Sequence, residues 1–139
     1  MSVSFDYFEH EADVGIVGMG DTLEEAFVGG ALALFSVMVD IEGVEPRLRA
    51  EVSCAAFNIE ELFIEWSNTL LAEADLRDMV FSKFEIDVLE EGRLHGYAFG
   101  EVLDPKRHSL RSEVKAATYS MLSVEYVDDL FVAKCVVDV

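Results

Sequence analysis

The sequence predicts an α+β fold: a compact two-layer sandwich of mainly antiparallel sheet with two main helices and a short third. Three observations support this prediction. The expected strands and helices do not alternate one by one, which disfavours a parallel α/β sheet. With 139 residues, 52% of them hydrophobic, the chain is long and apolar enough for one core, so residues 1–139 are expected to form a single domain. Finally, two pairs of strands flank short polar turns, as in antiparallel hairpins.

Seven segments have the residue pattern of β-strands. Their apolar residues alternate with polar ones, or form short apolar runs bounded by turn residues. The expected strands lie at residues 5–9, 14–19, 47–56, 79–89, 94–101, 122–127 and 131–137. Polar turns at 90–93 and 128–129 join two pairs of neighbouring strands, which predicts two hairpins.

The first helix is expected to begin just after Asp21 and to continue to Met38. Asp21 is the predicted N-cap, and Glu24 stands three residues later, in the capping-box position. Apolar residues then recur at helical spacing. The pair Gly29 and Gly30 weakens the helix, so its expected use is close packing of the helix on a sheet.

The second helix is expected to begin after Asn58, which has Glu61 in the capping-box position. Trp66 belongs to its apolar stripe, which predicts a place in the core rather than a role in ligand binding. Residues 113–119 contain helix formers and predict the short third helix.

The charge balance limits the classes of function. Twenty-eight acidic residues against ten basic ones give a net charge of −18. Contacts to phosphates need a surplus of Lys and Arg, so neither direct nucleic-acid binding nor attachment to an anionic membrane is expected. The basic residues gather only between Lys106 and Lys115, a pattern that alone fits a solvated loop as well as a binding patch.

The chain has no pattern typical of secretion or of membrane insertion. Its first ten residues lack a basic region, and the longest nearly apolar run, at 29–39, is too short to cross a bilayer. Cys54 and Cys135 are far apart, and we expect two buried thiols rather than a disulfide. A cytoplasmic location is therefore expected.

Few residues have the spacing of a catalytic or metal-binding motif. No phosphate-binding glycine loop or nucleophile elbow is present, and His10, His95 and His108 lack the spacing of a zinc site or a triad. Asp13 and Asp138 stand out because each adjoins apolar sequence, where a carboxylate needs a donor or a cation. If the two strand ends meet, these carboxylates would share one hard cation; if they do not, both are ordinary surface aspartates.

Several segments resemble the archease family, in order and over almost the whole chain. The segment HEADVGI at residues 10–16 is similar to the family's opening HTADVGI signature, and GDTLEEAF at 20–27 to its next block. Later matches include Glu101 with His108, the block EVKA at 113–116, and the closing Asp138-Val139. Two positions depart from the family pattern: Glu11 replaces the usual Thr, and Ser120 stands where His is frequent.

The resemblance implies an accessory protein rather than an enzyme. Archeases activate the RtcB-type ligase that joins tRNA halves, by promoting its guanylylation and multiple turnover and by broadening its use of nucleotides. The family's metal site falls on Asp13, Asp138 and Val139, with a divalent cation as cofactor, calcium first and magnesium or manganese as alternatives. Less directly, the resemblance points to Lys115, Asp21 and His10 as a surface that activates the partner.

The sequence is also compatible with other functions. A chaperone or modulator of other DNA- or RNA-processing proteins is the alternative, and an acidic surface is compatible with it. A small metal-dependent hydrolase built on Asp13 and Asp138 would need a base or nucleophile that the sequence does not show beside them. For an activator of charge −18, we expect docking on a basic surface of the ligase rather than contact with RNA.

Overall fold

The structure is a computed structural model that describes residues 2–139, and it contains two antiparallel sheets and two long helices. The larger sheet has the order β1-β2-β8-β6, with β7 also paired to β8; its strands are β1 (Val3–His10), β2 (Asp13–Gly20), β6 (Ala116–Ala117), β7 (Ser123–Val127) and β8 (Leu130–Asp138). The smaller sheet has the order β3-β5-β4, formed by β3 (Leu48–Ala55), β4 (Met79–Glu90) and β5 (Arg93–Val102). The helices are α1 (Leu23–Met38), α2 (Ile59–Arg77) and the single 3-10 turn η1 (Ile41–Gly43).

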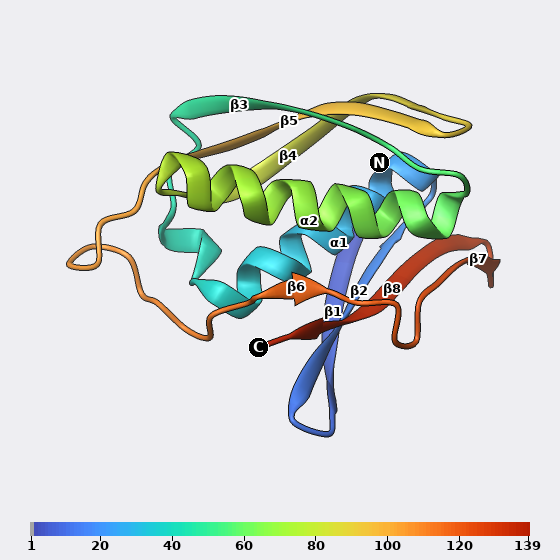
Figure 1. The fold of residues 1–139 in the computed structure, drawn as a ribbon, viewed down its shortest axis with the longest axis horizontal. Coiled ribbons are helices and arrows are strands. Elements are labelled where there is room, and N and C mark those ends of the chain that lie inside the picture. The colour runs from blue at the N-terminus through green and yellow to red at the C-terminus, as the bar shows by residue number, and fades with distance from the viewer. Residues whose placement is uncertain (1) are drawn as a thin grey trace.

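The two helices lie between the two sheets (Figure 1). Helix α1 packs on β1, β2 and β8 on one side and on β4 on the other, while α2 packs mainly on β3, β4, β5 and β6. The α+β class, the antiparallel pairing and both long helices are therefore confirmed. The layering differs from the expected two layers, because each helix buries apolar residues against both sheets.

Helix α1 begins one residue later than predicted. Its N-cap is Thr22, whose Oγ1 accepts a hydrogen bond from the Glu25 N–H at 3.1 Å. The Glu25 carboxylate in turn accepts from the Thr22 N–H at 3.1 Å, which completes the capping box. Asp21 and Glu24 do not have the predicted capping roles, because Thr22 has the extended backbone that an N-cap requires.

Glycines allow α1 to lie very close to the larger sheet. A Cβ on Gly18 of β2 would come within 2.0 Å of the Ala26 carbonyl oxygen and 2.1 Å of the Gly30 nitrogen. A Cβ on Gly29 would meet the Ser4 carbonyl oxygen at 2.4 Å. The predicted close packing on a sheet is confirmed for Gly29, whereas a Cβ on Gly30 would meet the Phe63 ring of α2 at 2.5 Å. At Gly18, β2 and α1 share a backbone contact with no side chain between them.

The core is aromatic where the helices cross. Phe27 and Phe63 pack edge to face with ring centroids 5.1 Å apart. Trp66 is fully buried, and its indole N–H donates to the Phe27 carbonyl oxygen at 2.9 Å. Asn58 caps α2 by accepting from the Glu61 N–H at 2.8 Å, as predicted.

Cys54 and Cys135 are free thiols, and burial raises the pKa of each, to about 11 and about 12 respectively.

The predicted short helix at 113–119 is wrong. Residues 116 and 117 instead form β6, which pairs with the C-terminal end of β8 and places Ala116 opposite Asp138. The side chain of Asn68 on α2 holds this strand from the other side: it accepts from the Ala117 N–H at 2.8 Å and donates to the Ala117 carbonyl at 3.3 Å. A seven-residue helix is marginal in water, so these tertiary hydrogen bonds override its propensity.

The two predicted hairpins are confirmed. In the β7–β8 turn, Asp128 and Asp129 have φ of 52° and 65°, the left-handed values that a tight two-residue hairpin needs. Across residues 2–139, no helix combines the length and apolarity needed to cross a membrane.

Candidate metal centre at one end of the β2–β8 ladder

Asp13 and Asp138 lie at the same end of two paired strands. In the antiparallel ladder between β2 and β8, Val14 pairs with Val137, so the next pair outward is Asp13 with Asp138. The Val139 N–H donates to Asp13 Oδ1 at 3.3 Å, which ties the two strand ends together. The condition set by the sequence, that the two ends meet, is therefore fulfilled.

These two carboxylates have no cationic side chain of their own. Within residues 2–139, neither Asp13 nor Asp138 forms an ion pair, and both are half-buried. Like charges directly opposite each other on adjacent strands repel. The possible ligand atoms fit a hard divalent cation, since all of them are oxygens: those of the two carboxylates and the main-chain oxygens of Val139. In the described chain, no cluster of three or more His, Cys, Asp or Glu residues adds further ligands.

Lys115 and His10 flank this centre. The Lys115 backbone N–H donates to the Asp138 carbonyl oxygen at 2.7 Å, which places Lys115 beside the carboxylate pair with its side chain exposed. His10 is the cross-strand neighbour of Asp13, because β1 pairs with β2 through a tight turn at Glu11 and Ala12. Glu11 has φ of 56°, and its side chain is exposed in this turn.

Asp21 lies at the other end of β2. Seven residue steps separate Asp13 from Gly20, which at about 3.3 Å per residue corresponds to about 23 Å. The structure therefore brings together five of the six residues that the sequence singled out, and leaves Asp21 apart. Asp21 is exposed, and its backbone N–H donates to the Glu25 carboxylate at 2.9 Å.

A cavity of about 880 Å³ lies next to Lys115. It runs between the C-terminal half of α2 and the segment 110–116, and Arg111 and Lys115 contribute to its lining together with Asp75, Asp78 and Glu113. Arg111 is held in place because its guanidinium donates to the Ser36 carbonyl at 3.0 Å. The basic segment is thus part of the wall of this cavity and leads directly to the carboxylate pair.

A buried ionic cluster that the sequence did not reveal anchors the basic loop. Glu101 is only 5% exposed and accepts hydrogen bonds from the Glu45 N–H at 2.8 Å and from His108 Nε2 at 3.0 Å. It also pairs with the Arg107 guanidinium, which together with the other donors holds the pKa of the Glu101 carboxyl well below its usual range. His108 Nδ1 accepts from the Asp104 N–H at 2.9 Å, so the ring joins the beginning of the loop to Glu101 of β5.

One sequence signal pointed toward this cluster. Glu101 continues an alternating apolar strand, and a charge at such a position needs a buried partner. The partners come from the following loop and from residue 45, and this pairing depends on tertiary structure. The cluster therefore has a positioning role: it holds the loop that leads to Lys115.

Comparison with known proteins places this architecture. The model of the Archease protein family matches residues 5–139. A protein called archease from Sulfurisphaera tokodaii is 40% identical over 136 residues, which cover 97% of this chain and 98% of that protein. Another from Thermococcus gammatolerans is 42% identical over 128 residues, which cover 90% of each chain. The chain belongs to the archease family.

Solved structures agree with this assignment. The solution structure of protein 1598 from Methanobacterium thermoautotrophicum matches with a TM-score of 0.84 and 34% identity, covering 98% of this chain and 99% of that one. A crystal structure from Thermotoga maritima, described as an archease and possible chaperone, matches with a TM-score of 0.63 at 20% identity and covers 95% of this chain and 94% of that one. This second likeness supports the fold alone.

Proposed function

We propose that this protein is an accessory activator of an RtcB-type tRNA-splicing RNA ligase. It promotes guanylylation of the ligase, supports multiple turnover and broadens nucleotide use. The observation that carries this proposal is the pair Asp13 and Asp138, opposed at one strand end without a cation of their own in the described chain, in a protein of the archease family. Such a pair is a site that an external cation completes.

Asp13, Asp138 and a main-chain oxygen of Val139 would hold this divalent cation. Calcium is the first expectation, because flexible oxygen ligands suit it, and magnesium or manganese are the alternatives. When bound, the cation would supply positive charge to neighbouring phosphate oxygens. The chain's own contribution is to position these oxygen ligands with Lys115 beside them, while His10 lies across the strand pair.

In this proposal the protein itself catalyses no reaction. Phosphoryl transfer depends mainly on positioning and on charge stabilisation, so a protein without its own nucleophile can accelerate it by ordering the active site of another. A net charge of −18 favours a basic surface of the ligase as the docking site, and it disfavours RNA and membranes as direct partners. The place of action would be the cytoplasm.

The test is multiple-turnover RNA joining by the ligase from the same source, with GTP and limiting enzyme. We expect turnover with the wild-type protein and none with Asp13→Ala or Asp138→Ala, provided that circular dichroism shows both variants folded. Folded Lys115→Glu is expected to lose activation as well. Asp6→Ala, at an exposed aspartate in the middle of β1 and away from the carboxylate pair, is the matched control and should activate fully.

Asp21→Ala measures how far the activating surface extends. Because Thr22 rather than Asp21 caps α1, loss of activation in this variant would report on the surface and not on helix stability. Full activation by both Asp13→Ala and Asp138→Ala would remove the metal centre from the proposal. If folded wild-type protein has no effect on the ligase, the activator function is wrong.

A chaperone for DNA- or RNA-processing proteins is the second candidate. The Thermotoga maritima protein of the same fold is described as a possible chaperone, and the acidic surface suits basic clients. Selectivity separates the two functions. Protection of several unrelated clients from aggregation, without stimulation of the ligase, would favour the chaperone.

A further inference from the structure

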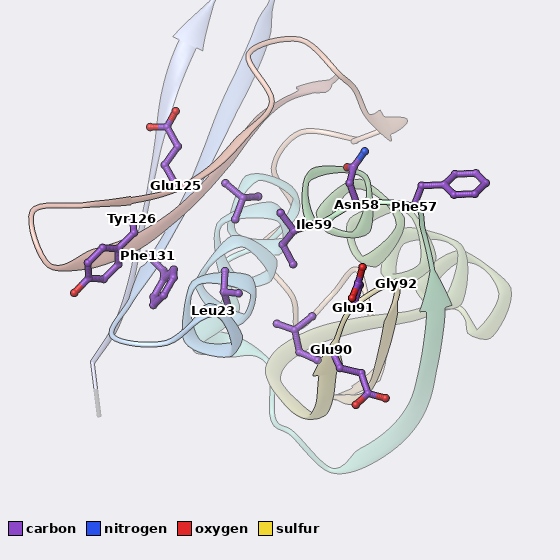
Figure 2. Close-up of a pocket in the computed structure, with 12 residues that line it drawn as sticks. Leu23, Phe57, Asn58, Ile59, Glu90, Glu91, Gly92, Glu125, Tyr126 and Phe131 are labelled. Atoms are coloured by element: carbon purple, nitrogen blue, oxygen red, sulfur yellow. The ribbon is translucent and has the colours of Figure 1, made fainter.

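A second opening lies at the end of the β2–β8 ladder opposite to Asp13 and Asp138. The register places Phe131 opposite Gly20 at this end, and Phe131 lines a groove of about 510 Å³. Figure 2 shows that the β7–β8 hairpin forms one wall of the groove, with the first turns of α1 and α2 beside it and the β4–β5 hairpin on the far side. We refer to this opening as the hairpin groove.

The floor of the hairpin groove is apolar and only partly covered. Five of its lining residues are half-buried hydrophobic side chains that pack on the edge of the main core: Leu23, Ile59, Leu89, Val124 and Phe131. Tyr126 packs on Phe131 with ring centroids 4.7 Å apart and is still 60% exposed. The floor therefore offers apolar surface that a bound apolar side chain would remove from water.

The rim of the groove is acidic. Glu90, Glu91 and Glu125 are exposed and come from both hairpins. Glu90 pairs with Arg93 at 2.8 Å, whereas in the described chain Glu91 and Glu125 form no ion pair. The negative rim around an apolar floor selects for an occupant that carries positive charge around an apolar anchor.

Other classes of occupant fit less well. The N-terminus of α2 opens on the groove, but Asn58 already caps it and Glu60 and Glu61 follow in the first turn, which disfavours an anion. A second copy of this chain would bring another net charge of −18 against the acidic rim. An anionic lipid surface is disfavoured for the same electrostatic reason.

We propose that the hairpin groove docks a short basic segment of a partner protein that inserts an aromatic or aliphatic anchor. This inference goes beyond the activator function and does not depend on it. The groove and the metal centre lie at opposite ends of one strand ladder, so both can be occupied at once. If the proposed activator function holds as well, the chain links two partners: one bound at the carboxylate end and one held at the groove.

A defined peptide tests the proposal. The probe is a synthetic hexapeptide with a central Trp-Leu pair flanked on each side by two Lys or Arg residues, titrated into isotope-labelled full-length protein while amide NMR shifts are followed. We expect saturable shifts centred on the groove-lining residues. A peptide with Ser-Gly in place of Trp-Leu, and one with Glu in place of the basic residues, should both bind far more weakly.

Two charge-matched variants separate docking from general attraction. The rim variant carries Glu90→Lys, Glu91→Lys and Glu125→Lys, and the control carries reversals at three exposed acidic residues elsewhere: Asp6→Lys, Glu42→Lys and Asp75→Lys. Each reversal adds two charges, so both variants move the net charge from −18 to −12. The rim variant should weaken peptide binding on the order of tenfold, and the control by less than about threefold.

Three outcomes would overturn the proposal. Equal weakening in both variants means that the peptide only senses the net charge. Shifts spread over the acidic surface rather than centred on the groove have the same meaning. A groove-dependent dimer in light scattering, lost in the rim variant, would assign the groove to a second copy of this chain instead.

Discussion

Two pairs of carboxylates in this protein differ in whether a side chain of the fold lies between them. On the smaller sheet, Glu51 of β3 and Asp87 of β4 flank β5, and His95 lies between them with ring nitrogens 2.7 and 2.6 Å from their oxygens. At the end of the β2–β8 ladder, Asp13 and Asp138 face each other with no such residue between them in the described chain. Both carboxylates of the first pair lie within hydrogen-bond distance of one side chain of the fold, whereas the second pair has no such partner among the described residues.

Buried Glu101 extends this comparison to the interior. Its charge is balanced by Arg107, and His108 Nε2 and the Glu45 N–H donate hydrogen bonds to it, so its partners are also built in. Where this fold only needs stability, it supplies the counter-charge. A carboxylate pair left without one is therefore the place to look for function.

The largest effect is expected from breaking the built-in partnership of Glu101. His108→Ala removes a buried ring and both of its hydrogen bonds, and should cost about 2 kcal/mol of unfolding free energy. Urea denaturation measures this loss. His10→Ala, at a half-buried histidine near the metal centre, is the comparison variant and should change stability much less. Equal losses in the two variants would contradict the anchoring role of the Glu101 cluster.

A smaller effect is expected from releasing β6, which positions Lys115 next to the unbalanced pair. Asn68→Ala leaves the Ala117 N–H and carbonyl without their side-chain partner and should cost about 1–2 kcal/mol. Asn68→Asp keeps the acceptor for the N–H and should cost less. Calcium affinity, measured by calorimetry, should fall in Asn68→Ala because the strand beside Asp138 is loosened. Unchanged affinity with lowered stability would show that β6 has no part in the metal centre.

The unbalanced pair itself should respond in the opposite direction. Without divalent ions, Asp13→Asn or Asp138→Asn relieves the repulsion and should raise stability by about 0.2–1 kcal/mol. With calcium added, only the wild-type protein should gain melting temperature, because the ion binds the folded state. Asp21→Asn, at the far end of β2, should retain the calcium response. A calcium-dependent gain that persists in both Asp13→Asn and Asp138→Asn would place the ion elsewhere.

The smallest effect concerns His95 on the smaller sheet and depends on pH. The carboxylates of Glu51 and then Asp87 accept hydrogen bonds from the protonated His95 ring, which raises the pKa of His95 above its ordinary value of 6.5. The stabilisation is therefore fully present below the unfolded pKa and is lost as the pH rises through the folded one. NMR titration of the His95 ring should give this raised pKa, and Glu51→Gln with Asp87→Asn should lower it toward 6.5. If the pKa of His95 is the same in the wild type and in the double variant, the two carboxylates do not hydrogen-bond to the histidine in solution.

The sequence alone predicted most strands and both long helices, because periodicity and capping are local signals. It misplaced the cap of α1 by one residue, since Asp21 and Thr22 both suit that role and only backbone conformation separates them. It predicted a helix at 113–119, where hydrogen bonds with Asn68 and with β8 stabilise a strand instead. Local propensity cannot include a partner that lies 49 residues away in the chain.

The candidate site was predicted only in part. Asp13 and Asp138 were found because apolar sequence adjoins each, yet their meeting depended on strand order, which the sequence left open. Glu101 and His108 were not recognised as a cluster, because a buried charge is identified by its partners. The hairpin groove was not anticipated at all, since four separate parts of the chain build it.

The contact of Gly18 with α1 has a mechanical consequence. Because backbone contacts backbone there, any shift of β2 toward the helix would produce a direct clash. The ladder thus keeps the carboxylate pair at one end and the hairpin groove at the other about 23 Å apart. Partners held at the two ends would meet at a spacing set by the fold itself, whatever the flexibility of the partners.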